Sequence, residues 1–204
     1  MRKFVFIIFF AFFSSSSTVL FSQTISLNKN KVFIVGRGTI DKQQFVKKLN
    51  IENNYLTHIG IGFFENDDFV IYHVSINNLN NGSALIKEDY NSFISEKGVF
   101  YKAIWEINLI SFNKIYVLDE IKKISQKPII FDNEYDLSNE PNKLYCSEFV
   151  SIVINNVANN LFQPIRTSEA RNKIIRNLAN ERLYYPADFF IKNKSFKMIY
   201  EYCK

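Results

Sequence analysis

The sequence predicts one α+β domain in which a sheet packs against amphipathic helices. Two observations predict this class: β-rich runs bounded by turn residues fill the first half of the chain, and apolar stripes at helical spacing fill the second half. A third observation, the lack of internal repeats and of a Gly/Pro-rich linker, argues for a single unit. The roughly 180 residues that follow a predicted leader are enough for a sizeable hydrophobic core.

The first 23 residues have the pattern of a secretory signal peptide. Two basic residues precede the ten-residue apolar run Phe4–Phe13, and cleavage is expected near Ser22 or Gln23. The alternative is an uncleaved N-terminal membrane anchor, which would need the apolar run to extend to Phe21. No cysteine lies near position 20, which excludes lipoprotein attachment. We therefore expect residues 24–204 to form an exported, periplasmic or secreted domain.

The charge balance of the mature chain is mild. Without the leader, 23 Lys and Arg residues stand against 20 Asp and Glu residues, and the basic residues are scattered. Neither a basic patch nor a nucleic-acid motif is present, so a nucleic-acid partner is not expected.

The first half of the chain is read as a series of strands with two helical insertions. The patterns predict strands at 32–35, 57–64, 69–75, 83–86 and 100–107, a helix at 41–49 and a short helical turn at 90–95. The first strand is expected to end at Gly36-Arg37-Gly38, and Asp41 is the expected N-cap of the helix. The polar run Glu65–Asp68 is expected to form a four-residue turn between the second and third strands.

The second half is read as mainly helical. The patterns predict helices at 113–125, 144–161 and 167–180, a polar loop at 132–142 and an extended segment after 184–189. The expected buried stripe of the first of these helices is Ile115, Leu118, Ile121 and Ile124. The expected stripe of the second is Phe149, Val150, Val153, Ile154 and Val157.

The only two histidines, His58 and His73, lie on the second and third predicted strands. If Phe63 pairs with Asp68 across the four-residue turn, the two histidines lie directly opposite each other on one face. Cross-strand partners have Cβ atoms about 5 Å apart, so one imidazole could orient the other. Gly60 on the same face leaves room for another element to approach closely. The alternative is two ordinary polar residues at strand ends.

Cys146 lies near the start of the predicted helix at 144–161. Unpaired backbone N–H groups and the positive end of the helix dipole favour a thiolate there. The N–H of Cys146 could also donate to an oxyanion. A cysteine at a helix start that faces a histidine on a strand is the minimal set for a thiolate nucleophile. A small buried side chain is the alternative role for a free cysteine.

Two further interpretations stay open at this point. His58, His73 and Cys146 could together ligate zinc, although the chain has no CxxC or HxxxH spacing. An exported compartment would also permit a disulfide between Cys146 and Cys203, although two cysteines do not make a disulfide scaffold. We expect no metal and no cofactor.

Five motifs are scattered over residues 30–202: Thr57–Ile61, Val70–His73, Tyr135-Asp136, Tyr145–Phe149 and Tyr184–Phe189. Together they resemble the motifs of the YiiX/YebB-like permuted papain-fold hydrolases, within the NlpC-type superfamily. The Tyr-Cys-Ser-Glu block is the most specific of them. The resemblance implies a circularly permuted papain-like fold, with an antiparallel sheet packed against helices and a cysteine at a helix N-terminus. In that permuted order the histidine precedes the cysteine, as it does here.

The resemblance also implies roles for the candidate residues. It makes Cys146 the nucleophile, His58 the general base and His73 the residue that orients the base. The neighbouring residues assigned by the resemblance to substrate binding or oxyanion stabilisation are Tyr145, Ser147 and Glu148.

The chain departs from the family pattern at two points. Many relatives have a glutamate where this chain has His73, and a neutral imidazole stabilises an imidazolium less than a carboxylate does. Relatives also often carry Gly-Asp on the first strand, where this chain has Val35–Gly38.

These observations predict an exported thiol amidase or peptidase that acts on a small peptide, amide or acyl substrate. Cell-wall peptides and N-acyl amines are the expected substrates by analogy with the family. One alternative is a lipid thioesterase or acyltransferase of the same fold, with the abundant Phe and Tyr residues lining an acyl pocket. Another is a binding module with a weakened site, which the His73 departure favours. We also expect that the protein could associate with the cell envelope or with a membrane surface.

Overall fold

The computed structural model describes residues 27–53, 55–76, 83–110, 112–137, 140–169 and 181–204. The predicted signal peptide lies outside these residues, and so does most of the helix predicted at 167–180, of which only a 3-10 turn at Thr167–Glu169 is described. No helix within the described ranges has the length and apolar character needed to span a bilayer.

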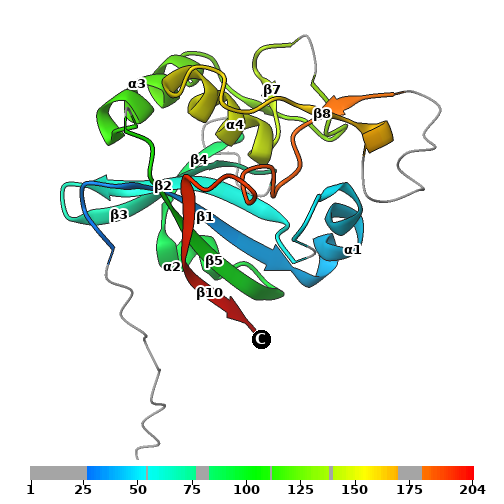
Figure 1. Ribbon diagram of the computed structural model, residues 1–204, viewed down its shortest axis with the longest axis horizontal. Coiled ribbons are helices and arrows are strands. Elements are labelled where there is room, and N and C mark those ends of the chain that lie inside the picture. Colours follow the sequence, from blue (N-terminus) through cyan, green and yellow to red (C-terminus); the bar gives the residue numbers. More distant parts are fainter. Residues whose placement is uncertain (1–26, 54, 77–82, 111, 138–139, 170–180) are drawn as a thin grey trace, which may run out of the picture.

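A six-stranded sheet, antiparallel throughout, forms the centre of the molecule (Figure 1). Its strand order is β10-β5-β1-β2-β3-β4. The strands are β1 (Val32–Thr39), β2 (His58–Glu65), β3 (Asp68–Val74), β4 (Leu85–Asp89), β5 (Val99–Ile107) and β10 (Phe196–Cys203). This order places the first four strands of the chain side by side. One polar side chain from each of them, Arg37, His58, His73 and Glu88, takes part in a single network.

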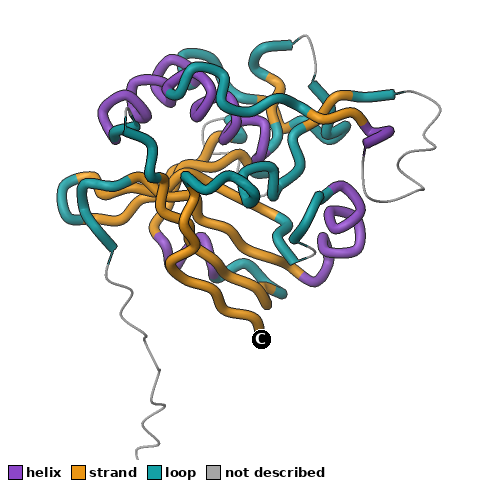
Figure 2. The backbone as a smooth tube through the Cα atoms, viewed as in Figure 1, coloured by secondary structure: helices purple, strands orange, loops and turns teal. Residues whose placement is uncertain are grey.

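Helices flank both faces of the sheet (Figures 1 and 2). One face is covered by α3 (Lys114–Ile124) and α4 (Cys146–Val157), and the opposite face by the short α2 (Tyr90–Ile94). The helix α1 (Ile40–Leu49) follows β1. Two small two-stranded sheets complete the described elements: β6 (Ile130–Phe131) with β7 (Lys143–Leu144), and β8 (Ile165–Arg166) with β9 (Leu183–Tyr184).

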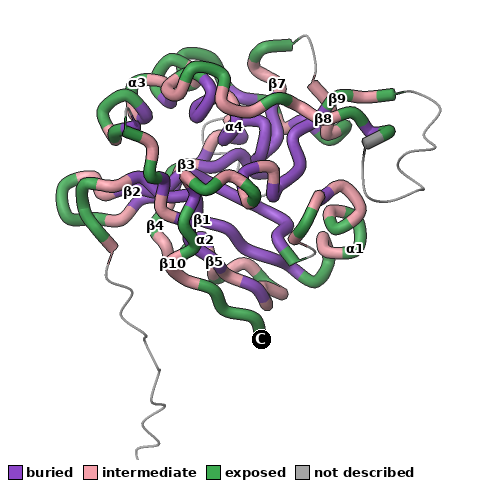
Figure 3. Tube along the Cα trace, viewed as in Figure 1, coloured by how far each residue is buried: buried purple, intermediate pink, exposed green. Residues whose placement is uncertain are grey.

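The hydrophobic core consists of two clusters of buried side chains. The central strands of the sheet and α4 are the most continuously buried parts of the backbone (Figure 3). The larger cluster lies between the sheet and the α3/α4 layer, and includes Ile59 and Ile61 of β2 with Phe149 of α4. The smaller cluster lies on the opposite face and consists of Phe33, Val35, Ile71, Phe93 and Ile104. The predicted α+β class, with an antiparallel sheet packed against helices, is therefore confirmed.

The register of the β2–β3 hairpin differs from the expected one. Glu65 pairs with Asp68, so the turn has two residues rather than four, and Phe63 faces Val70 instead of Asp68. The short turn is possible because Asn66 adopts a left-handed backbone (φ 55°), which asparagine tolerates better than most residues. The shift is two residues, so every side chain keeps the face that was predicted for it.

The first strand does not end at Gly36-Arg37-Gly38 but continues through these residues to Thr39. The two glycines serve close packing here. A Cβ at Gly36 would lie 2.4 Å from Leu56 Cδ1, and one at Gly38 would lie 2.1 Å from the carbonyl oxygen of Tyr55. Arg37 therefore lies on a regular strand, and its side chain is buried.

The helix starts also needed correction. Thr39, and not Asp41, is the N-cap residue of α1, which begins at Ile40. The helix predicted at 144–161 is shorter at both ends. Residues 143–144 form a strand instead, and α4 ends ahead of Asn159, whose φ of 54° is left-handed and does not continue a right-handed helix.

In α3, the expected N-terminal boundary is correct, since the Asn113 side chain accepts hydrogen bonds from the N–H groups of Ile115 and Tyr116. The expected buried stripe is partly wrong, because the Ile115 side chain is 63% exposed. Val117 and Ile121 are the buried residues of this helix.

Candidate active site

The two histidines lie together, as predicted, although not directly opposite each other. His58 is the first residue of β2 and His73 lies near the end of β3, and both side chains are buried. Their Nε2 and Nδ1 atoms, respectively, are 2.8 Å apart. Gly60 makes this diagonal contact possible, because a Cβ at that position would come within 3.0 Å of His73 Cβ.

A glutamate that the sequence analysis missed completes this pair. Glu88 of β4 lies with its Oε1 2.7 Å from His73 Nε2. His73 therefore has a carboxylate as its hydrogen-bond partner, supplied by the neighbouring strand β4. The strand predicted at 83–86 was too short, because β4 runs on to Asp89. Continuing its alternation from Ile86, which pairs with His73, would have placed Glu88 on the same face.

We call His58, His73 and Glu88 the relay. The carboxylate of Glu88 can only accept a hydrogen bond, so His73 carries its proton on Nε2 and presents an unprotonated Nδ1. That Nδ1 must then accept the proton of His58 Nε2. The relay thereby leaves Nδ1 of His58 as an unprotonated base.

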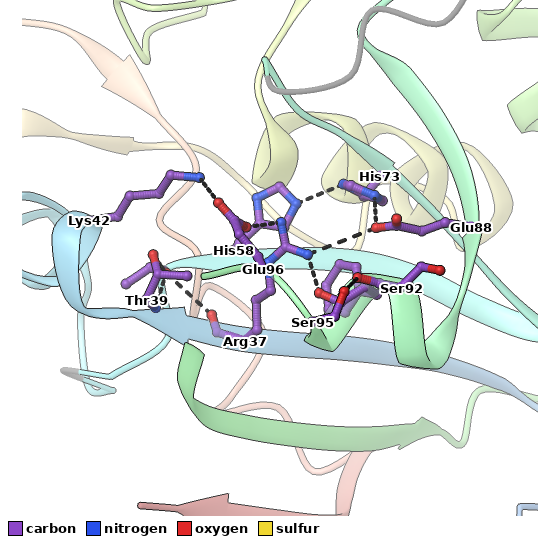
Figure 4. A network of polar contacts seen from close by, with 11 residues as sticks. Arg37, Thr39, Lys42, His58, His73, Glu88, Ser92, Ser95 and Glu96 are labelled. Carbon is purple, nitrogen blue, oxygen red and sulfur yellow. Dashed lines mark hydrogen bonds and ion pairs between the residues drawn. The ribbon is translucent and has the colours of Figure 1, made fainter. Parts of the chain in front are cut away.

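A buried arginine, Arg37, lies next to the relay (Figure 4). Arg37 pairs with His58 in the β1–β2 register and forms ion pairs with Glu96 and, at 3.9 Å, with Glu88. Its guanidinium carbon lies 4.4 Å from the ring centroid of Phe93. The ion pair of Glu96 with Lys42 continues this network to the surface.

Burial favours the neutral form of both histidines. Burial, followed by the positive charge of Arg37, lowers the pKa of His58 well below its ordinary value. Burial also lowers the pKa of His73, although the hydrogen bond to Glu88 acts in the opposite direction. A neutral His58 is the form that can accept a proton.

Cys146 is the first residue of α4, and its side chain lies against β2. Burial raises the pKa of its thiol above the ordinary value. The backbone N–H groups of Ile59 and Ser147, together with the charges of Lys42 and Arg37, act in the opposite direction and favour the thiolate. Because Ile59 directly follows His58, the sulfur lies beside the start of β2, the strand that carries His58.

A small cavity of about 20 Å³ opens next to Cys146. We call it the pocket; its lining residues are Val46, Leu49, Thr57, Tyr135, Tyr145, Cys146, Ser147, Tyr184, Tyr185, Pro186 and Ala187. None of them carries a formal charge, so the pocket differs sharply from the relay in character.

Tyr145 and Ser147, which were expected to contact substrate or oxyanion, line the pocket and also hold its wall. The N–H of Tyr185 donates to the hydroxyl of Tyr145 at 2.7 Å, and the Ser147 hydroxyl donates to the carbonyl of Tyr185 at 2.7 Å. Glu148 points elsewhere into the protein. Its Oε2 is buried and has no hydrogen-bond partner, and burial raises the pKa of this carboxyl to about 8.

The late Pro186-Ala187-Asp188 motif fixes the segment before β2. The buried carboxylate of Asp188 accepts hydrogen bonds from the backbone N–H groups of residues 51–53. This contact joins the pocket wall to the chain that leads into His58, and no sequence pattern had indicated that role.

The two alternatives for the cysteine and histidines can now be compared with the geometry. Cys146 and Cys203 are both free, so the disulfide interpretation is wrong. Across the residues that the structure describes, no group of three His, Cys, Asp or Glu side chains is arranged to hold a metal ion.

Comparisons with known proteins give a relationship at the level of the fold. Neither a family model nor a curated protein sequence matches the chain. Among solved structures, the chain is similar to the metalloprotein YiiX from Escherichia coli O157:H7, with a TM-score of 0.63 and 13% sequence identity. The match covers 87% of this chain and all of the YiiX chain. The YiiX-like fold that the sequence motifs indicated is therefore confirmed.

Proposed function

We propose that this chain is a cysteine hydrolase, an amidase or peptidase, which forms an acyl-enzyme on Cys146 with His58 as general base. The observation that carries the proposal is the relay. Its hydrogen bonds leave the Nδ1 of His58 free to accept a proton at the strand end beside the Cys146 sulfur. The order of the chain, histidine before cysteine, agrees with a permuted papain-like arrangement.

In the proposed reaction the Cys146 thiol keeps its proton at rest. When a substrate carbonyl arrives, His58 Nδ1 takes that proton as Sγ forms a bond to the carbonyl carbon. The N–H of Cys146, at the start of α4, donates to the oxyanion. The C–N bond then breaks, and the amine leaves with the proton from His58.

Hydrolysis of the thioester completes the cycle. A water molecule attacks the acyl carbon while His58 takes one of its protons. The C–S bond breaks, the carboxylic acid is released, and the proton returns from His58 to the sulfur. Through both halves His73 and Glu88 stabilise the transient imidazolium of His58.

The relay also bears on the alternatives. Both ring nitrogens of His73 already bond within the relay, so metal ligation by His73 would require the relay to break. YiiX is described as a metalloprotein, and the hydrogen bonds of this chain support an acid–base role for its histidines instead. The presence of a histidine at position 73 had favoured a binding module with a weakened site. The carboxylate of Glu88, hydrogen-bonded to His73, supports the catalytic interpretation instead.

The test compares Cys146→Ala with the matched variant Cys203→Ala, whose cysteine is exposed and does not line the pocket. Each protein is incubated with a mixed pool of peptides and N-acyl amines, and its intact mass is measured. An acyl adduct should form on the wild type and on Cys203→Ala, and should be absent from Cys146→Ala. Turnover should fall by about 10³-fold or more when Cys146 is replaced.

Turnover that survives in Cys146→Ala would contradict the proposal. Simple alkylation is a poor substitute for this test. Because Cys146 is buried with a raised thiol pKa while Cys203 is exposed, iodoacetamide should label Cys203 first.

A further inference from the structure

The pocket lies on one side of the nucleophile only. Cys146 lines it, whereas His58 is not among its described lining residues. In the proposed reaction the leaving group must receive its proton from His58, so it departs on the relay side. The group that remains bonded to the sulfur therefore extends away from the relay, toward the pocket.

Most of the polar side chains that line the pocket already make hydrogen bonds within the protein. The hydroxyl of Tyr145 accepts from the N–H of Tyr185, and the Tyr184 hydroxyl donates to the carbonyl of Leu49 at 2.9 Å. The Ser147 hydroxyl donates to the carbonyl of Tyr185, and Thr57 Oγ1 accepts from the N–H of Thr39 at 3.1 Å. These contacts hold the walls in place, and they leave mainly carbon surface for a ligand.

One wall residue, Tyr135, is held in an unusual conformation. Its φ of 54° is left-handed, which a bulky aromatic residue rarely adopts. The fully buried carboxylate of Asp132 accepts from the N–H groups on either side of it, Glu134 at 2.9 Å and Asp136 at 3.2 Å. Hydrogen bonds from neighbouring residues thus hold Tyr135 in this unfavourable backbone conformation. Backbone strain that is maintained in this way is often found at functional sites.

This conformation directs the Tyr135 ring into the aromatic wall beside the nucleophile. The ring centroid lies 5.7 Å from that of Tyr145 and 5.6 Å from that of Phe45. Burial, and after it the charge of a Cys146 thiolate, raise the pKa of Tyr135, so the phenol lies within electrostatic reach of the sulfur. Tyr135 and Cys146 therefore line the same small pocket, with the Tyr135 ring in its aromatic wall.

We propose that the pocket receives the acyl side of the substrate, that it selects a short, uncharged, apolar acyl group, and that Tyr135 sets the length limit. This inference rests on the proposed function, since it needs an acyl group on Cys146. The pocket is small, about 20 Å³, so a short acyl chain can lie against its walls whereas a long one must extend beyond them. The uncharged walls disfavour a carboxylate or an ammonium.

The test uses p-nitrophenyl esters of acetic, butyric, octanoic and succinic acid with the full chain. The activated leaving group makes acylation visible whether the natural bond is an amide or an ester. We expect kcat/KM for the octanoyl ester and for the succinyl half-ester to be about tenfold or more below that for the butyryl ester. This profile is measured on the wild type and depends on no variant folding.

Two substitutions then test Tyr135 itself. Tyr135→Gly removes the ring and also suits a left-handed backbone, so it should raise the octanoyl-to-butyryl ratio of kcat/KM about tenfold. Tyr135→Phe keeps the ring and should keep the wild-type ratio. Tyr116→Ala, an exposed tyrosine of α3 outside the pocket lining, is the matched control and should leave the ratio unchanged.

The outcomes separate the two proposals. If p-nitrophenol release persists in Cys146→Ala, the proposed function fails and this inference fails with it. If release depends on Cys146 but the chain-length profile is flat, or the succinyl half-ester matches the butyryl ester, only this inference is overturned. An unchanged ratio in Tyr135→Gly would overturn the role of Tyr135.

Discussion

The two sides of Cys146 are built from opposite kinds of side chain. On the relay side, buried charges and imidazoles from four neighbouring strands contact one another (Figure 4). On the pocket side, the lining is uncharged and rich in tyrosine. In the proposed function this difference separates two tasks: the relay side would move a proton, and the pocket side would accommodate an acyl group. Each side should therefore respond to mutation and to pH in its own way.

The largest expected effect comes from removing the cation of the relay side. Arg37→Met removes a buried cation from beside the partly buried Glu88 and Glu96, of which Glu96 keeps Lys42, so the free energy of unfolding should fall by about 3 kcal/mol. The matched variant is Arg166→Met, whose side chain is 57% exposed and pairs with Glu181, and its loss should be under about 1 kcal/mol. Urea unfolding measures both. If Arg37→Met lost no more unfolding free energy than Arg166→Met, the buried network would stabilise the protein no more than an exposed ion pair does.

A smaller effect is expected from Glu88→Gln, which tests the proton pathway. A glutamine amide can present N–H to His73 Nε2, and this would reverse the tautomers of both histidines and protonate Nδ1 of His58. We expect kcat/KM to fall about 10–100-fold, with partial recovery in Glu88→Asp. Glu65→Gln, at a β2 glutamate that pairs with Lys87 outside the relay, is the matched control. A loss in Glu65→Gln as large as that in Glu88→Gln would argue against a specific role for the relay.

The relay also shows which parts of the site a sequence can predict. The two histidines share a face because side chains alternate along strands, and the two-residue error in register left that alternation intact. Arg37 and Glu88 could not be found in the same way. Their contacts depend on the order β1-β2-β3-β4, which tertiary packing decides, and on strand ends that glycines and short polar runs had obscured.

The pocket side shows the same limit. The Tyr135-Asp136 pair was visible as a motif, but its left-handed backbone depends on Asp132, which supplies hydrogen bonds from outside that motif. Cys146 was found because local sequence places it at a helix start. The raised pKa of its thiol follows from burial by segments distant in the chain, and local sequence does not encode it.

The relay histidines and Glu148, which lies outside the pocket lining, should destabilise the fold at opposite ends of the pH range. His58 and His73 have lowered pKa values in the folded chain, so below about pH 6.5 the unfolded chain binds protons that the folded chain does not. Stability should therefore be lost as the pH falls below that value. Glu148 behaves in the opposite way, since its folded pKa of about 8 lies above its unfolded value. Between these values the folded chain keeps a proton that the unfolded chain has lost, so stability should fall as the pH rises.

Comparison with Glu148→Gln isolates Glu148 between pH 6.5 and 8, because the histidines of the unfolded chain, with an ordinary pKa of about 6.5, still titrate at the lower end of this window in both proteins. Glu148 itself should contribute a downward slope of up to about 1.4 kcal/mol per pH unit to the unfolding free energy of the wild type, or about 1.5 kcal/mol across the window. Glu148→Gln should remove this slope, as measured by urea unfolding at each pH. A slope that persists in Glu148→Gln would assign the effect to another group.

The smallest expected effect concerns the pocket wall. Ser147→Ala removes the hydrogen bond to the carbonyl of Tyr185 and should cost about 1 kcal/mol of stability. Because this bond ties the wall to α4 and does not reach the relay, KM should rise while kcat stays within about twofold. Ser125→Ala is the matched control, since its hydroxyl donates to the Lys122 carbonyl at the end of α3 and does not line the pocket. If Ser147→Ala instead lowered kcat with KM unchanged, the wall and the proton pathway would be coupled, and the division of the site into two sides would not hold.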